Sequence, residues 1–179
     1  MGLNFSGLSN ETMIQPTNGF YGGFWVTDKK ATNTDGGAFS SGAWRKRDLN
    51  EIEFSWGNVG TNTLSSNDVT LSVGWWLLRW SCPAVRVGEH NSSCNTSWGG
   101  VQYGTCARIP SGGYHVENRS FGWARFYFGG GGQSFAIYHK CDNGQSSSYG
   151  FGAGSNLQNP RFTEVYCLKY EYDTAGATP

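Results

Sequence analysis

The chain has little of what several functional classes require. Its 13 Lys and Arg balance 13 Asp and Glu, so the formal net charge is zero over 179 residues. Proteins that bind nucleic acid by neutralising phosphates need a basic surface, so we expect no nucleic-acid partner. No apolar run approaches the length of a membrane-spanning helix, and the N-terminus lacks the charged-then-apolar pattern of a signal peptide. We therefore expect no membrane partner.

Catalytic and metal-binding patterns are also missing. The three histidines, His90, His115 and His139, come without a nucleophile elbow, a His-x-x-x-His spacing or paired carboxylates. Half-buried histidines satisfied by neighbouring strands are the favoured interpretation. The sequence therefore predicts a protein that is not an enzyme and has no metal and no cofactor.

The five cysteines are an odd number without a C-x-x-C pair, so zinc spacing is absent. Cys94 and Cys106 bracket one loop and are the candidate disulfide if the protein matures in an oxidising compartment. Without an export signal, five reduced thiols are the favoured alternative.

What the chain does have is glycine and aromatic side chains. It contains 27 Gly, 8 Trp, 9 Tyr and 11 Phe, a composition typical of short strands joined by tight turns. The runs that predict strands are Phe20–Val26, Leu49–Trp56, Val69–Cys82, Val101–Ala107, Phe121–Phe128, Phe135–Cys141 and Phe162–Tyr172.

Two of these predictions carry specific expectations. Val69–Cys82 alternates up to Gly74 and then becomes apolar on both faces, which predicts one strand that ends against a second partner surface. Gly129–Gly132 joins two aromatic runs and predicts a hairpin turn. The stretch Pro83–Arg119 has the least regular pattern.

No helical period, internal repeat or heptad pattern is visible. Strands with turns between them predict an all-β fold, an antiparallel β-sandwich of the jelly-roll kind. The expected organisation is an N-terminal arm or tether at residues 1–18, one jelly-roll domain at 19–173 and a C-terminal tail at 174–179.

Six segments in order carry a resemblance. They are Gly36–Asn50, Leu64–Gly74, Cys82–His90, Phe135–Cys141, Gly150–Gly152 and Thr163–Tyr166. In this order the chain resembles the C-terminal domains of bacteriophage virion surface proteins that look like the C1q and tumour-necrosis-factor (TNF) jelly roll. The chain departs from the pattern at Trp75–Trp80, which is more apolar, and between Asn91 and Arg119.

The resemblance implies a homotrimer about a threefold axis, in which aromatic rings of inner strands meet. By analogy the trimer-interface candidates are Trp76, Trp80, Tyr166 and Tyr170; the alternative is that these rings fill the core of each monomer. The exposed-loop candidates for surface contacts are Trp98, Tyr103, Tyr114 and His115.

The implied function is that of a structural protein on the virion surface, a trimeric knob that decorates or cements a phage head through its N-terminal arm. Its partners would be other virion proteins of the capsid or tail. One alternative is a tail-fibre or spike tip for host attachment, which would contact a host glycan or surface receptor. Another is a lectin-like glycan-binding module, in which aromatic rings stack on sugar faces. A secreted cytokine-like ligand is disfavoured because a signal peptide is missing.

Overall fold

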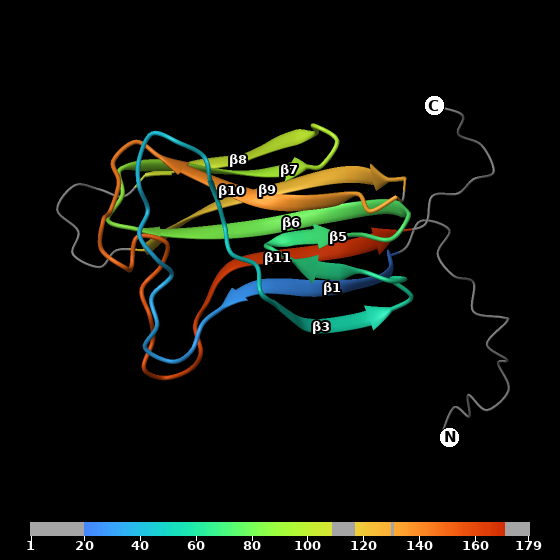
Figure 1. The fold of residues 1–179 in the computed structure, drawn as a ribbon, viewed down its shortest axis with the longest axis horizontal. Helices are drawn as coiled ribbons and strands as arrows, with labels where there is room; N and C mark the ends of the chain where they lie inside the picture. The colour runs from blue at the N-terminus through green and yellow to red at the C-terminus, as the bar shows by residue number, and fades with distance from the viewer. Residues whose placement is uncertain (1–19, 109–116, 130, 171–179) are drawn as a thin grey trace, which may run out of the picture.

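The computed structural model describes residues 20–108, 117–129 and 131–170. Within these ranges the chain forms eleven strands and no helix, arranged as two antiparallel sheets (Figure 1). The strands are β1 (Phe20–Lys29), β2 (Arg45–Lys46), β3 (Glu51–Gly57), β4 (Thr63–Ser65), β5 (Asp68–Thr70), β6 (Gly74–Val85), β7 (Glu89–Thr96), β8 (Val101–Arg108), β9 (Glu117–Phe128), β10 (Ser134–Cys141) and β11 (Arg161–Tyr170).

The five-stranded sheet has the order β3-β1-β11-β6-β9, and the six-stranded sheet has the order β4-β5-β10-β7-β8 with β2 added beside β10. Every pairing is antiparallel. The predicted all-β antiparallel sandwich is therefore confirmed. The predicted arm (1–18) and tail (174–179) lie outside the described residues, and the domain limits stay a prediction.

The core lies between the two sheets. Along β6 the side chains of Trp76, Leu78 and Trp80 alternate inward and are buried, as the period of two in a strand requires. They meet Phe135 and Ile137 of the six-stranded sheet in one apolar cluster. The neighbouring side chains of β6 must then point to the outer surface of the five-stranded sheet.

The structure corrects the prediction of one strand at Val69–Cys82. The chain forms two strands, β5 and β6, which lie in different sheets. Gly74 has φ = +134°, a conformation that side-chain-bearing residues rarely adopt, and it begins β6 where the chain has crossed between the sheets. Trp75 and Leu77 are only partly buried, so β6 is not covered on both faces by its own chain.

The predicted hairpin across Gly129–Gly132 is also wrong. β9 pairs with β6 in the five-stranded sheet, whereas β10 pairs with β5 and β7 in the six-stranded sheet. The glycine-rich turn therefore connects the two layers and not two paired neighbours. The stretch expected to be least regular contains β7, a central strand of the six-stranded sheet.

Candidate functional site

The outer surface of the five-stranded sheet is rich in aromatic side chains. One cross-strand row runs through all five strands and contains Phe54, Trp25, Tyr166, Arg79 and Trp123, each opposite the next in register. Residues directly opposite in antiparallel strands share a face and lie close enough to interact. The Trp25 and Tyr166 rings accordingly stack with centroids 5.6 Å apart and an interplanar angle of 2°.

Two further rows extend this surface. In one, Tyr170 stands opposite Trp75, and Trp75 stands opposite Tyr127. In the other, Leu168 stands opposite Leu77 in the middle of the sheet. We define the aromatic face by the outward apolar side chains of these rows and their edges, which are Trp25, Phe54, Trp56, Trp75, Leu77, Phe121, Trp123, Tyr127, Tyr166, Leu168 and Tyr170. The charged side chain of Arg79 lies among them.

The aromatic face is open to solvent in the single chain. Six of its aromatic side chains are between 43% and 68% exposed, and they are Phe54, Trp56, Phe121, Trp123, Tyr127 and Tyr166. A whole aromatic side chain has about 150–250 Å² of surface, so the exposed parts of these six side chains together amount to roughly 700 Å². The largest apolar patch of a typical monomer is ~300–600 Å², and a stable interface covers about 800 Å² per partner. The face therefore has the size and composition of an interface.

A groove of about 430 Å³ crosses the aromatic face beside β9. Tyr166, Leu168, Phe121 and Trp123 contribute to its walls. Trp80 and Gly122, which are paired on β6 and β9, also line it. The groove gives the face a hollow that an apolar side chain of a partner can enter.

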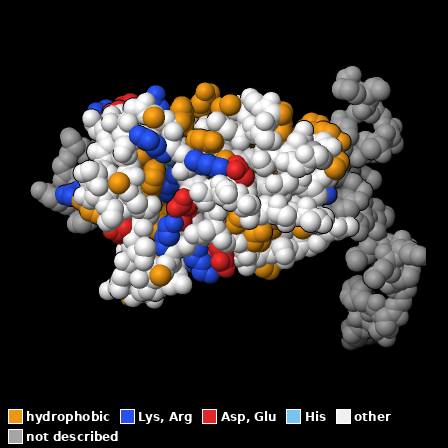
Figure 2. Space-filling model, viewed as in Figure 1, with side chains coloured by type: hydrophobic (Ala, Val, Ile, Leu, Met, Phe, Trp, Pro, Cys, Tyr) orange, Lys and Arg blue, Asp and Glu red, His pale blue; other side chains and the backbone are white. Residues whose placement is uncertain are grey.

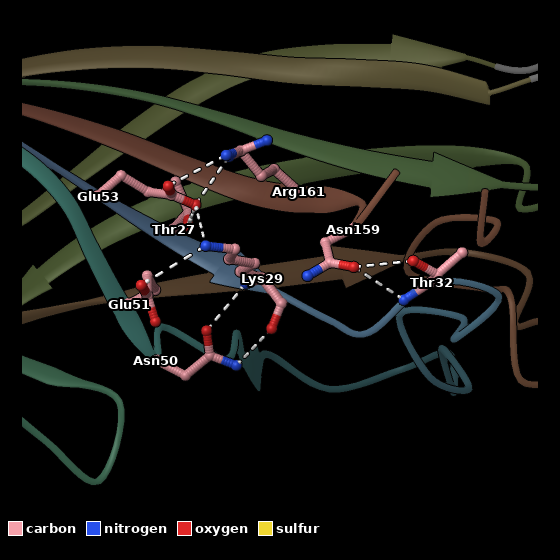
Figure 3. A network of polar contacts seen from close by, with 8 residues as sticks. All are labelled: Thr27, Lys29, Thr32, Asn50, Glu51, Glu53, Asn159 and Arg161. Carbon is pink, nitrogen blue, oxygen red and sulfur yellow. Dashed lines mark hydrogen bonds and ion pairs between the residues drawn. The ribbon is translucent and has the colours of Figure 1, made fainter. Parts of the chain in front are cut away.

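Charged groups collect at the end of the face where β1 ends and β11 begins. Arg161 donates from Nε and Nη2 to the two carboxylate oxygens of Glu53, over 2.8 Å and 3.0 Å (Figure 3). Lys29 lies 3.4 Å from the same carboxylate, and Arg161, the main cause, holds the pKa of Glu53 below its ordinary value. Arg119 donates to Glu164 over 2.8 Å nearby.

Charged pairs lie beside the exposed rings of the aromatic face, as in the pair of Arg161 with Glu53. Figure 2 shows one face of the molecule, on which apolar side chains form separate small groups and Lys, Arg, Asp and Glu side chains lie among them. An apolar centre beside a polar rim is the usual anatomy of a protein–protein interface. The arrangement is suited to binding a protein surface.

The four interface candidates divide into two pairs. Tyr166 and Tyr170 lie on the aromatic face, and their role in a trimer interface stays a prediction. For Trp76 and Trp80 the interface assignment is wrong, because both indoles are buried in the core of one chain. Trp76 donates from Nε1 to the carbonyl of Ser72, and Trp80 donates to the Ser92 hydroxyl, each over 2.9 Å. Both polar atoms are thus satisfied inside the sandwich.

The surface-contact candidates do not form one cluster among the described residues. Trp98, in the turn between β7 and β8, is partly exposed and packs edge-on against Phe128 with centroids 4.9 Å apart. Tyr103, on β8, is exposed and packs against Trp44 at 5.8 Å. Tyr114 and His115 lie outside the described residues.

The candidate disulfide is not present. Cys94 and Cys106 are both free, although β7 and β8 pair. Cys94 is buried in the core opposite Gln102, whereas Cys106 is exposed opposite Asn91. The two thiols are therefore offset along the strands and cannot meet without moving the backbone.

The prediction from sequence missed most of the aromatic face, notably Phe54, Phe121, Trp123 and Tyr127. The signal was present, since Phe121, Trp123 and Tyr127 recur with a period of two.

Among residues 20–108, 117–129 and 131–170, no group of three or more His, Cys, Asp or Glu side chains is placed to hold a metal ion. The same described segments contain no helix long and apolar enough to cross a membrane.

Comparison with known proteins identifies the fold. No protein-family model matches the chain, and no curated protein sequence is similar enough to count as a relative. Among solved structures, the chain is similar to Eiger TNF from S. frugiperda, with a TM-score of 0.51, 11% identity, and coverage of 89% of this chain and 98% of that one. The crystal structure of murine APRIL at pH 8.0 gives a TM-score of 0.48 and 9% identity, with 82% and 98% coverage. The sandwich of this chain is therefore a TNF-like jelly roll.

Proposed function

We propose that this chain forms a homotrimer by burying its aromatic face against two other copies. The observation that carries the proposal is the roughly 700 Å² of aromatic side chain exposed on one sheet of a single chain, close to the area that one partner contributes to a stable interface. The C1q- and TNF-like resemblance adds the threefold arrangement.

A second copy of the chain is the favoured occupant of the face for an electrostatic reason as well. With zero formal net charge and a pI near 6.8, identical copies repel one another little at neutral pH. The charged pairs at the rim, such as Arg161 with Glu53, are already satisfied within the chain. The centre of the face offers apolar rings around the exposed side chain of Arg79, and apolar contacts of this kind are typical of obligate assemblies.

For the trimer itself, we propose a structural role on the surface of a bacteriophage virion, as a head decoration or cement protein. This location is supported by the six segments of sequence resemblance, and the tether role belongs to residues 1–18. Other virion proteins of the capsid are the expected partners. The proposed role is one of binding and assembly, without catalysis.

A receptor-binding tip of a tail fibre or spike is the second candidate. The observation that favours it is that Trp44, Tyr103 and Trp98 are exposed on strands and turns of the six-stranded sheet, apart from the aromatic face. A trimer joined through the five-stranded sheet would leave these rings free for a host glycan or surface receptor. A lectin-like module would use the same rings without a particle.

Gold labelling of purified particles with antibodies against the chain distinguishes these roles. Label distributed over heads supports decoration, and label confined to tail ends supports the receptor-binding tip. Absence of label from every particle, in preparations where the chain is detected as free protein, contradicts a virion role. Binding of that free protein to immobilised glycans would then favour the lectin-like module.

If residues 1–18 are the tether, chains that lack them should still form trimers but fail to occupy particles. The matched control is the full-length chain added to the same particles at the same concentration. Full occupancy by the shortened chain would contradict the tether assignment and leave the trimer proposal intact.

A further inference from the structure

Two histidines contact each other inside the sandwich, at the end away from the row that contains Trp75 and Tyr127. His90 of β7 and His139 of β10 are 2% and 0% exposed, and Nδ1 of His90 lies 2.8 Å from Nε2 of His139. A hydrogen bond between two imidazoles needs one N–H donor and one bare nitrogen acceptor. The pair can hold one extra proton at most without losing this bond, and two protons would place donor against donor.

A permanent positive charge lies beside the pair. Arg47 follows β2 and is buried, with Nε donating to Thr163 Oγ1 over 2.6 Å and Nη2 donating to the carbonyl of Phe151 over 3.0 Å. Its guanidinium also lies 4.0 Å from the centre of the Phe151 ring. A cation held in the interior strongly opposes a second positive charge nearby, because little water screens the two.

Other charged and titratable groups surround the pair and Arg47. Asp28 and Asp48 lie near enough to Arg47 to favour its charge, and Asp142 raises the pKa of His90. From β10 and the turn after it come exposed Lys140 and Asp142, from β2 comes exposed Arg45, and from β7 comes exposed Glu89. From β6 comes the Cys82 thiol, whose pKa is raised by burial to about 11, so it stays neutral. From β8, opposite His90, comes the apolar Ala107.

The environment keeps both imidazoles neutral. Burial, and then Arg47, lowers the pKa of His90 to about 4, although Asp142 acts in the opposite direction. Burial, Arg47 and His90 together hold the pKa of His139 well below its ordinary value. In an opened or unfolded chain both would titrate near 6.5, so acid favours any state that exposes them.

Two aromatic loop residues cover His139, one member of the pair. The Phe39 ring lies 4.6 Å from the His139 ring, and the Phe151 ring lies 4.4 Å from Phe39 and 6.3 Å from His139. Phe39 exchanges two backbone hydrogen bonds of 2.8 Å with Gln145, and Phe151 donates to the carbonyl of Gly37 over 2.9 Å. Figure 1 shows these loops at the end of the sandwich where β1 ends and β11 begins.

These loops form the weaker part of the interior. Phe39 and Phe151 belong to a small cluster with Ala84, Val87 and Cys141, separate from the main core between the sheets. Segments with few buried apolar neighbours open at lower free energy than core strands. The loops around Phe39 and Phe151 can therefore open while the main core stays closed.

We propose that His90 and His139 form an acid-sensitive switch: below about pH 6, proton uptake by the pair releases the Phe39 and Phe151 loops from the end of the sandwich. The strands of the five-stranded sheet, and with them the aromatic face, stay in place. This switch is independent of the proposed virion role.

The direction of the pH effect follows from the pKa values of the two histidines in the closed state and in the exposed state. Because the folded pKa values are lowered, the closed state is fully stabilised above about pH 6.5 and loses stability as the pH falls toward 4. Between pH 7.5 and 5.0, uptake of two protons raises the population of the opened state about a thousandfold, and uptake of one proton about thirtyfold.

Hydrogen exchange at single-residue resolution, corrected for the intrinsic effect of pH, measures this opening directly. Between pH 7.5 and 5.0, the amides of Phe39, Gln145 and Phe151 should lose protection about a thousandfold if the pair takes up two protons, and about thirtyfold if it takes up one. The β6 and β11 amides, such as those of Leu78 and Val165, provide the internal control and should keep theirs. Unchanged protection in the loops, or an equal loss in β6 and β11, would overturn the proposal.

Two substitutions remove the titrating groups while keeping the hydrogen bond. His90→Asn places an amide near the former Nδ1, and His139→Gln places one near the former Nε2. The double variant should show less than about a twofold pH effect in the loops, and each single variant about thirtyfold. A double variant that retains the full acid response would contradict the assignment to this pair. If the double variant does not fold, exchange in the unaltered chain still decides.

Discussion

Gly122 lets the Trp80 indole lie directly against the backbone of β9. The ring belongs to the buried core and is held by its hydrogen bond to Ser92, so it has no free direction in which to move. A methyl group at Gly122 would meet it at 2.1 Å. The small size of Gly122 is therefore a requirement of the core.

Gly122→Ala should therefore lower the free energy of unfolding by about 1–3 kcal/mol, the range for overpacked cores. Chemical denaturation monitored by tryptophan fluorescence measures this change. Gly129→Ala is the matched control, because its new Cβ would find no atom closer than 3.7 Å and its φ is not positive. Equal stability of the two variants would show that Trp80 can yield without loss.

At the scale of single elements, the edge strand β3 is secured by one carboxylate. Glu53 binds Arg161 of β11 through two hydrogen bonds and lies near Lys29 of β1 (Figure 3), so it ties three strands together. Bidentate pairs of arginine with a carboxylate are the strong members of their class. Glu51, also on β3, forms an ion pair with Lys29 at 3.5 Å and is half exposed.

Glu53→Gln should lower the opening free energy of β3 by about 0.5–1 kcal/mol at pH 7, which is roughly a two- to fivefold loss of amide protection. Because the folded pKa of Glu53 is lowered, its contribution is present above pH 4.5 and is lost as the pH falls further. The difference between variant and unaltered chain should therefore close in acid. Glu51→Gln is the control; a loss as large as that of Glu53→Gln would contradict the special role of Glu53.

Which elements could be predicted from sequence depended on where their apolar side chains point. The strand at Phe162–Tyr172 was confirmed as β11, up to Tyr170, because one buried face and one aromatic face give a clear alternation. β7 was missed because its inward residues are His90, Ser92, Cys94 and Thr96, which are small or polar. Hydrophobic periodicity cannot reveal a strand of that kind.

Pairing of elements was harder to predict than their existence. The glycines after β9 indicated a turn correctly, but a turn does not specify whether the next strand returns beside the first or crosses to the other sheet. Likewise the run Val69–Cys82 did not reveal its break at Gly74. In both places the choice is made by long-range packing of the two sheets, which local sequence does not encode.

At the scale of the whole molecule, the many aromatic side chains of the sequence divide between two places. Some of them, including Trp76 and Trp80, fill the core, and others form the aromatic face. Sequence reasoning anticipated a surface that needs a partner and named Tyr166 and Tyr170 as interface candidates. Both lie on the aromatic face, and their interface role stays a prediction. Sequence reasoning could not separate these from the core rings, because alternating strand residues differ only in the direction in which they point.

Trp123→Glu should weaken trimer formation by about 2 kcal/mol or more per subunit contact, because it places a charge at the most exposed ring of the aromatic face. Sedimentation velocity of the variant should show a shift toward the single chain. Trp44→Glu, on the six-stranded side, is the control and should leave assembly unchanged. Assembly of the Trp123→Glu variant as strong as that of the control would place the interface elsewhere.

The most direct test of the account is the mass of the full chain in solution at neutral pH, measured by sedimentation equilibrium over a wide range of concentration. Burial of the aromatic face predicts a mass three times that of one chain, with little dependence on concentration. A mass equal to a single chain throughout the range would contradict the claim that this face is an interface between copies.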